Sequence, residues 1–320
     1  MEKTRVCSLF GIEYPIIQGG MAHLSNPELV AAVSEAGGLG MLTPGGAFRE
    51  ESIVPDLRRD IRQVRALTKK PFGVNVGARA FAGAVEACLE AALEEGATIF
   101  IVGAAPPDRY TKRLKDAGAV VMHGVFCTRH ARRAEQEGVD VVIAAGFEAG
   151  GHLSPLELST FVLVPQVVDA VSIPVVAAGG IADARGMVAA MALGAEGIQM
   201  GTRFLATAEC TAHTNYKQAI LKVADTDMVV TGRRANNLAR VIRNRLADKI
   251  MELEASGASV QAILDFIGPG RLKAAAAEGN TEEGSLMCGQ VAGMIREIVS
   301  VKELIQSLVT GYDSIVAKLK

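Results

Sequence analysis

The chain has 320 residues, of which 49% are hydrophobic, and its 33 Lys and Arg nearly balance its 35 Asp and Glu, giving a formal net charge of −2 at neutral pH. The balance argues against a nucleic-acid or membrane-surface binder, which needs a local excess of positive charge, and the hydrophobic content argues against disorder. At roughly 150 residues per domain, the length fits two domains or one α/β barrel with a small addition.

Short apolar runs recur along residues 1–205, with amphipathic segments of helical period between them. The eight predicted strands are residues 15–19, 39–42, 72–76, 98–103, 119–124, 140–146, 174–180 and 197–201. Because these runs are continuously apolar rather than alternating, we expect parallel strands covered by helices on both faces. Eight such βα units predict a (β/α)8 TIM barrel rather than an open doubly wound sheet.

The pattern changes after residue 205. Residues 206–284 are charged and helical in period, apart from a short MVV run at 228–230. We predict a small helical subdomain over the barrel mouth that covers the substrate. Residues 285–320 are expected to return to the barrel as a C-terminal helix, and the loop 43–55 is expected at the same face as the subdomain.

The last two predicted strands carry glycines where barrel enzymes commonly bind phosphate. One ends in AAGGIAD (177–183) and the other in QMGTRF (199–204). Glycines let main-chain N–H groups approach an anion closely, and a following helix N-terminus favours negative charge. We therefore predict a phosphate between Gly180 and Gly201–Thr202, with the Thr202 hydroxyl as a further donor. The alternative is that these glycines only form tight turns.

Small residues at other strand ends leave a flat slot with polar edges. QGGM (18–21) follows the first strand, Asn75 ends the third, Gly103 follows the fourth and EAGGH (148–152) follows the sixth. Such a slot suits a planar ring whose edge is bound by an amide, and with the phosphate it predicts flavin mononucleotide (FMN). Ordinary loop hydrogen bonding is the alternative role of Gln18 and Asn75.

The motifs QGGMA, AGGLG, KPFGVN, GFEAGGH, AAGGIAD and GTRFL, in this order, resemble a flavoprotein family over essentially the whole chain. This family groups nitronate monooxygenases with FMN-dependent enoyl-acyl-carrier-protein reductases. The resemblance implies an FMN-binding barrel in residues 1–205, with His152 as catalytic acid/base. The implied cofactor-binding residues are Gln18, Gly19, Gly20, Met21, Asn75, Glu148, Gly151, Gly179, Gly180, Gly201 and Thr202. His23 stands where many members have an aromatic residue.

His152 differs from the other four histidines because two glycines precede it in a tight turn that aims it over the mouth. Its ordinary pKa near about 6.5 suits proton transfer at neutral pH. His130 is expected at the surface, and His123 is expected to have a core or loop role. His213 is expected to be structural, with a place in the pocket lining as the alternative. None of the five has metal-ligand spacing with a carboxylate or cysteine, so we predict no metal.

Several reactions of one flavin site stay open. In the preferred one, an alkyl nitronate, or a nitroalkane deprotonated by His152, is oxidised by O2 through FMN. The alternatives are an NADH- or NADPH-dependent reduction of an enoyl thioester on acyl carrier protein, NAD(P)H:quinone reduction and, without flavin, a barrel that binds a phosphorylated metabolite.

The cysteines and the N-terminus predict the location. The five cysteines are scattered without CxxC spacing, no long apolar run follows the first charges, and none of the apolar stretches reaches the roughly 18 residues of a membrane span. We therefore expect a cytoplasmic enzyme with a small-molecule substrate, without membrane or nucleic-acid partners, and assembled as a homodimer.

Overall fold

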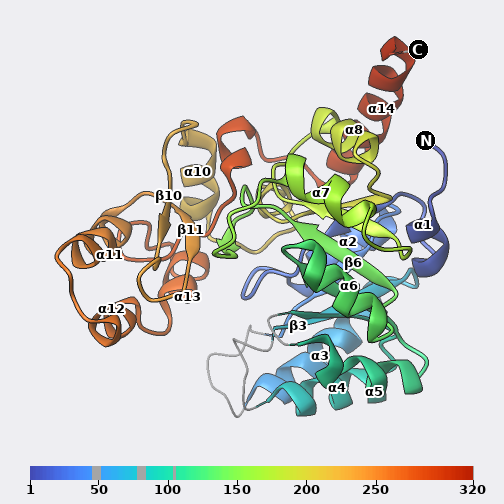
Figure 1. The fold of residues 1–320 in the computed structure, drawn as a ribbon, viewed down its shortest axis with the longest axis horizontal. Coiled ribbons are helices and arrows are strands. Elements are labelled where there is room, and N and C mark those ends of the chain that lie inside the picture. The colour runs from blue at the N-terminus through green and yellow to red at the C-terminus, as the bar shows by residue number, and fades with distance from the viewer. Residues whose placement is uncertain (45–51, 78–83, 104–105, 320) are drawn as a thin grey trace.

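The computed structural model describes residues 1–44, 52–77, 84–103 and 106–319 (Figure 1). Most of the predicted loop 43–55 lies outside these ranges. The eight barrel strands are β1 (Ile16–Gln18), β2 (Gly40–Leu42), β3 (Phe72–Gly77), β4 (Ile99–Gly103), β5 (Val120–Val125), β6 (Val141–Ala145), β8 (Val175–Ala178) and β9 (Gly197–Met200).

These strands are parallel and follow the order β1-β9-β8-β6-β5-β4-β3-β2. A parallel bridge between Ile17 and Leu39 brings β1 next to the start of β2, which nearly closes the ring. The predicted TIM barrel is thus confirmed.

Both faces of the barrel strands are apolar. Ile17, Met41 and Ile143 belong to the cluster that fills the barrel, whereas their neighbours Ile16 and Val142 pack in the cluster beneath the surrounding helices. This two-sided burial explains why the strands are continuous apolar runs in the sequence. The inner cluster also contains buried residues of α1 (Arg5–Phe10), so this helix covers one end of the barrel.

The helices α2 (Pro27–Glu35), α3 (Ile53–Leu67), α4 (Val85–Glu94), α5 (Thr111–Asp116), α6 (Thr128–Gln136), α7 (Thr160–Val168) and α8 (Ala184–Ala192) connect the strands, with the short η2 (Pro107–Arg109) before α5. Directly after β9, in the place where a long barrel helix would follow, the chain forms the four-residue α9 (Thr202–Leu205). The long α14 (Val301–Leu319) packs instead against α8 and α2, which is the place of the missing barrel helix.

Residues 206–284, called the cap below, contain α10 (Thr214–Lys222), α11 (Arg245–Ala255), α12 (Val260–Ile267) and α13 (Arg271–Ala276), together with a hairpin. The hairpin strands β10 (Met228–Thr231) and β11 (Ala239–Ile242) are antiparallel, and β11 pairs on its other side with β7 (Gly151–His152). The sequence predicts no strand here beyond the MVV run, so the helical subdomain contains a second strand that was not expected. The charged Arg240 interrupts the apolar residues of β11 and hides its strand pattern.

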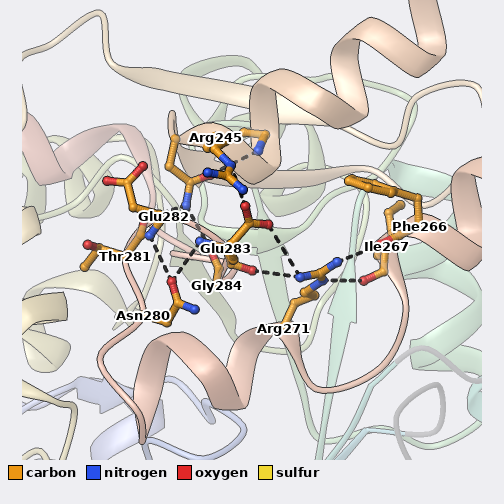
Figure 2. Close-up of polar contacts among 11 residues, drawn as sticks. Arg245, Phe266, Ile267, Arg271, Asn280, Thr281, Glu282, Glu283 and Gly284 are labelled. Atoms are coloured by element: carbon orange, nitrogen blue, oxygen red, sulfur yellow. Dashed lines mark hydrogen bonds and ion pairs between the residues drawn. The ribbon is translucent and has the colours of Figure 1, made fainter.

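Figure 2 shows how the end of the cap is fixed. The Glu283 carboxylate lies between two arginines, 2.6 Å from Arg245 Nε and 3.7 Å from Arg271 Nη1. The Arg271 guanidinium also donates hydrogen bonds of 3.3 Å to the main-chain oxygens of Phe266 and Ile267. Residues 285–300, called the return segment below, run from this cluster through η3 (Gln290–Met294) to α14. Within the described ranges no helix is long and apolar enough to span a membrane.

Candidate active site

The loop after β1 is held by the side chain of Gln18, which is fully buried. Its Oε1 accepts a hydrogen bond from Met41 N at 2.9 Å, and its Nε2 donates to Ser25 Oγ at 2.9 Å and to the main-chain oxygen of Gly19. Both N–H groups of this amide are therefore used inside the protein. This side chain, which was predicted to bind the ring edge, fixes the loop, and Ser25 Oγ also accepts from Met21 N at 2.8 Å.

Beside this loop lie two polar side chains with unused hydrogen-bonding capacity. A Cβ on Gly20 would lie 2.1 Å from Asn75 Nδ2 and 2.5 Å from Thr43 Oγ1, so only glycine fits between them. Thr43 Oγ1 is buried and has no hydrogen-bond partner among the described residues. The half-buried Asn75 amide likewise makes no hydrogen bond to a side chain of the residues that the structure describes. The ends of β1, β2 and β3 thus offer an amide and a hydroxyl to a ligand.

The loops after β8 and β9 present main-chain N–H groups. Gly179 and Gly180 have φ values of +92° and +72°, a conformation that favours glycine. Within the described ranges, the N–H groups of Gly180, Gly201 and Thr202 donate no hydrogen bond to a main-chain oxygen outside their own element. Thr202 Oγ1 accepts from Gly289 N at 2.9 Å and keeps its proton to donate. Since α9 has four residues, individual N–H groups, rather than a long helix dipole, favour an anion here.

The turn after β6 is tied to its neighbours by hydrogen bonds. The Glu148 carboxylate accepts from Thr160 N at 2.8 Å and from Thr160 Oγ1 at 2.9 Å, at the first residue of α7. The Glu148 main-chain oxygen accepts from Gln290 N at 3.0 Å. A Cβ on Gly150 would lie 2.4 Å from Gly289 N, so the return segment lies directly on the turn. Glu148, predicted to bind the cofactor, therefore caps the start of α7 and anchors the return segment.

His152 lies in β7, exposed, and pairs with Ala239 of β11. Its main chain is thus held between the barrel turn, where Gly151 has a φ of +73°, and the cap. A cavity of about 20 Å³ beside it has apolar walls from Phe126, Phe147 and Leu158. Such a cavity has room for about one water molecule or methyl group.

The other histidines have separate environments. His123 on β5 is buried, and its burial lowers its pKa despite a hydrogen bond to the main chain at Val102. His213 Nδ1 accepts from Asn215 N at 3.1 Å and caps α10, which confirms its structural role. His130 is half-buried, with its ring edge-to-face to that of Phe126, rather than fully at the surface.

His23 follows the β1 loop with a left-handed backbone, at a φ of +64°. Burial lowers its pKa, and the positive charge of Lys273 on α13 lowers it further. The cap therefore lies close to the loop that carries Gly20.

A wide cleft of about 700 Å³ lies on the cap, away from the strand ends. Its lining includes charged residues that are paired with one another, as in Arg243 with Asp248 and Lys249 with Glu252. Because these charges are satisfied within the protein, we place the candidate site at the barrel mouth. Within the described ranges no group of three or more His, Cys, Asp or Glu could hold a metal ion.

Two residues at the mouth were not predicted from the sequence. Thr43 directly follows β2 and is signalled by its place at a strand end, as Asn75 was. Arg240 lies in a run whose charges suggest a helix, so no local signal marks it.

A family model described as nitronate monooxygenase matches residues 3–311. The solved structure of FabK from Thermotoga maritima superposes with a TM-score of 0.92 and 44% sequence identity, covering 100% of this chain and 99% of that chain.

Two curated relatives are similar over nearly the same length. The (3aS,4S,5R,7aS)-5-hydroxy-7a-methyl-1-oxo-octahydro-1H-indene-4-carboxyl-CoA dehydrogenase of Mycobacterium tuberculosis is 36% identical, over 96% of this chain and 95% of its own. A probable nitronate monooxygenase of Staphylococcus saprophyticus is 35% identical, over 96% of each chain. These similarities include the cap as well as the barrel.

Proposed function

The chain belongs to the nitronate monooxygenase family of flavin-dependent oxidoreductases, and we propose that it oxidises alkyl nitronates with O2 using FMN. The observation that carries the proposal is the set of unused polar groups at the mouth. Three main-chain N–H groups lie after β8 and β9, while the Thr43 hydroxyl lies after β2 and the Asn75 amide lies in the second half of β3. A ligand with an anionic end and a polar planar ring would satisfy both sets.

The residues fit FMN in this proposal. Gly180, Gly201 and Thr202 hold the phosphate, because charge-assisted hydrogen bonds from N–H groups favour an anion. Asn75 binds the polar edge of the ring, and Gly20 leaves room for the ring beside the main chain. The other expected contacts, at Gly19, Met21, Gly151 and Gly179, line the same loops. Gln18 and Glu148 act as positioning residues, since their side chains are bonded within the protein.

His152 is the proposed acid/base. Bound FMN supplies the electron transfer between substrate and oxygen. When the substrate arrives as a neutral nitroalkane, the His152 imidazole takes the proton from the carbon that bears the nitro group. A nitronate has already lost this proton, so it does not need the step. The apolar side chains beside His152, Phe126, Phe147 and Leu158, would face the alkyl side of the substrate.

A second candidate is the NADH- or NADPH-dependent reduction of an enoyl thioester, with acyl carrier protein as a partner. It is favoured by the Mycobacterium tuberculosis relative, whose name describes a carboxyl-CoA, which is a thioester. In this reaction His152 would donate a proton to the carbon next to the thioester carbonyl.

We also propose that residues 206–284 cover the substrate, that the enzyme is cytoplasmic and that it assembles as a homodimer. Light scattering after size-exclusion chromatography tests the dimer.

Reconstitution tests the cofactor. The protein freed of flavin should bind FMN at a ratio of one to one and bind riboflavin at least about tenfold more weakly, because riboflavin lacks the phosphate. The reconstituted protein should then consume oxygen with an alkyl nitronate. Equal affinity for FMN and riboflavin would contradict the phosphate site, and a protein that binds neither would contradict the flavin proposal.

A further inference from the structure

Arg240 on β11 lies against the turn that carries His152, although it belongs to the cap. The residue is only 3% exposed. Its Nε donates to the main-chain oxygen of Ala149 at 3.2 Å, and its Nη2 donates to that of Phe147 at 2.8 Å. The guanidinium carbon lies 4.8 Å from the centre of the Phe147 ring. One side chain thus binds the main chain of the turn at two points and stacks on its aromatic residue.

A buried guanidinium is costly unless its charge is compensated. The described residues give Arg240 carbonyl oxygens as hydrogen-bond acceptors, without a hydrogen-bonded carboxylate. The charges of Glu148 and Glu157 attract it, and the charge of Arg233 repels it. An apolar side chain of similar length would fill the same space at lower cost. The planar fork of arginine, by contrast, can fix two carbonyls in one orientation.

The turn needs such a constraint because of its composition. Gly150 and Gly151 directly precede His152, and glycines give the backbone more freedom than any other residue. In the pairing of β11 with β7, Arg240 lies opposite Gly151 and Ala239 opposite His152. β11, the strand that carries Arg240, therefore also pairs with the main chain of His152.

We propose that Arg240 is a positioning residue that clamps the carbonyls of Phe147 and Ala149 and thereby sets the direction in which His152 faces the barrel mouth. The proposal rests on the proposed role of His152 as acid/base. It assigns the cap a part in the chemistry besides covering the substrate.

Arg233 provides a matched control within the same chain. Its guanidinium carbon lies 5.8 Å from the centre of the same Phe147 ring, and it pairs with the Glu157 carboxylate. No hydrogen bond from Arg233 to the carbonyls of the turn is present among the described contacts. Arg233→Met therefore removes a neighbouring positive charge and a ring contact but leaves the clamp.

Turnover of a nitroalkane by the FMN-loaded enzyme gives the first test. Arg240→Met should lower kcat roughly 10- to 100-fold, with KM changed much less and FMN still bound, because a small misplacement of a catalytic group has effects of this size. Arg240→Lys should recover part of the loss, and Arg233→Met should stay close to the unmodified enzyme. In a His152→Ala background, Arg240→Met should have no further effect. Equal losses in both backgrounds, or equal effects of the two Met variants, would overturn the proposal.

Hydrogen exchange of the peptide spanning residues 147–152, followed by mass spectrometry, gives a test that needs no activity. Exchange should be faster in Arg240→Met, intermediate in Arg240→Lys and unchanged in Arg233→Met. Unchanged exchange in the folded Arg240→Lys protein would overturn the clamp, even if Arg240→Met does not fold. Failure of the unmodified enzyme to act on nitroalkanes or nitronates would instead contradict the proposed function, so the two failures are distinguishable.

Discussion

The two sides of the barrel mouth use their polar residues in opposite ways. At the ends of β2 and β3, Thr43 Oγ1 and the Asn75 amide have hydrogen-bonding capacity that the described residues leave unused. At the turn after β6, Glu148 and Arg240 are bonded to the protein's own main chain. We propose that the first side binds a ligand and that the second side positions His152. A polar residue at a strand end therefore does not by itself indicate a ligand contact.

This difference also has an energetic meaning. A buried polar atom without a partner costs about 1–3 kcal/mol, so the side with Thr43 is expected to gain stability when a ligand supplies one. The side with Glu148 has already made its bonds, and its residues should contribute to stability with or without ligand.

The largest expected effect is that of His152→Ala. Turnover of a neutral nitroalkane should fall by roughly 10² to 10⁴-fold, while FMN stays bound, because a general base is lost. Turnover of the corresponding nitronate, prepared by prior deprotonation, should fall much less. Steady-state oxygen consumption with the two forms measures both. An equal loss with both substrates would show that His152 does not act on this proton.

Glu148→Ala should come next, as a loss of stability. It leaves Thr160 N without its acceptor at the start of α7, while Thr160 Oγ1 keeps the main-chain oxygens of Ala178 and Gly179 as acceptors. The loss of the capping carboxylate should lower the free energy of unfolding by about 1–3 kcal/mol. Urea unfolding of the flavin-free protein gives the value, and the matched comparison is Asn75→Ala on the other side of the mouth. If Glu148→Ala were as stable as the unmodified protein, the two sides of the barrel mouth would not differ in their contribution to stability.

Asn75→Ala should have the reverse pattern and a smaller effect. The free energy of unfolding without flavin should change little, because the amide makes no side-chain hydrogen bond within the described part of the protein. The affinity for FMN should fall by about 5- to 10-fold, as expected for one neutral hydrogen bond. Fluorescence titration of FMN measures the affinity. A large loss of stability with unchanged FMN affinity would show that Asn75, like Glu148, acts through bonds within the protein rather than through a contact with FMN.

The smallest effect concerns pH. Burial lowers the pKa of His123, so this histidine takes up a proton more readily in the unfolded chain than in the folded one. Its contribution to the free energy of unfolding is complete above the unfolded pKa of about 6.5 and is lost as the pH falls below it. His123→Gln should make the pH dependence between about pH 7 and 5 shallower. An unchanged slope in urea unfolding at several pH values would contradict this assignment.

The sequence predicted what depends on local pattern. Continuous apolar runs marked the barrel strands because both of their faces are buried. Gly179 and Gly180 after β8 could be singled out because their left-handed backbone favours glycine. The roles of Gln18 and Glu148 could not be predicted, since they depend on partners farther along the chain, Met41 N and Thr160. The role of Arg240 could not be predicted for the same reason, because its partners in the turn are 91 and 93 residues away in the sequence.

Anaerobic absorbance spectroscopy separates nitronate oxidation from enoyl reduction. We expect an alkyl nitronate to bleach the flavin absorbance of the FMN-loaded protein without oxygen, and oxygen to restore it when admitted. Flavin that is untouched by the nitronate, but is bleached rapidly by NADH or NADPH and recovers its absorbance with crotonyl thioester, would contradict nitronate oxidation and establish the enoyl reductase instead.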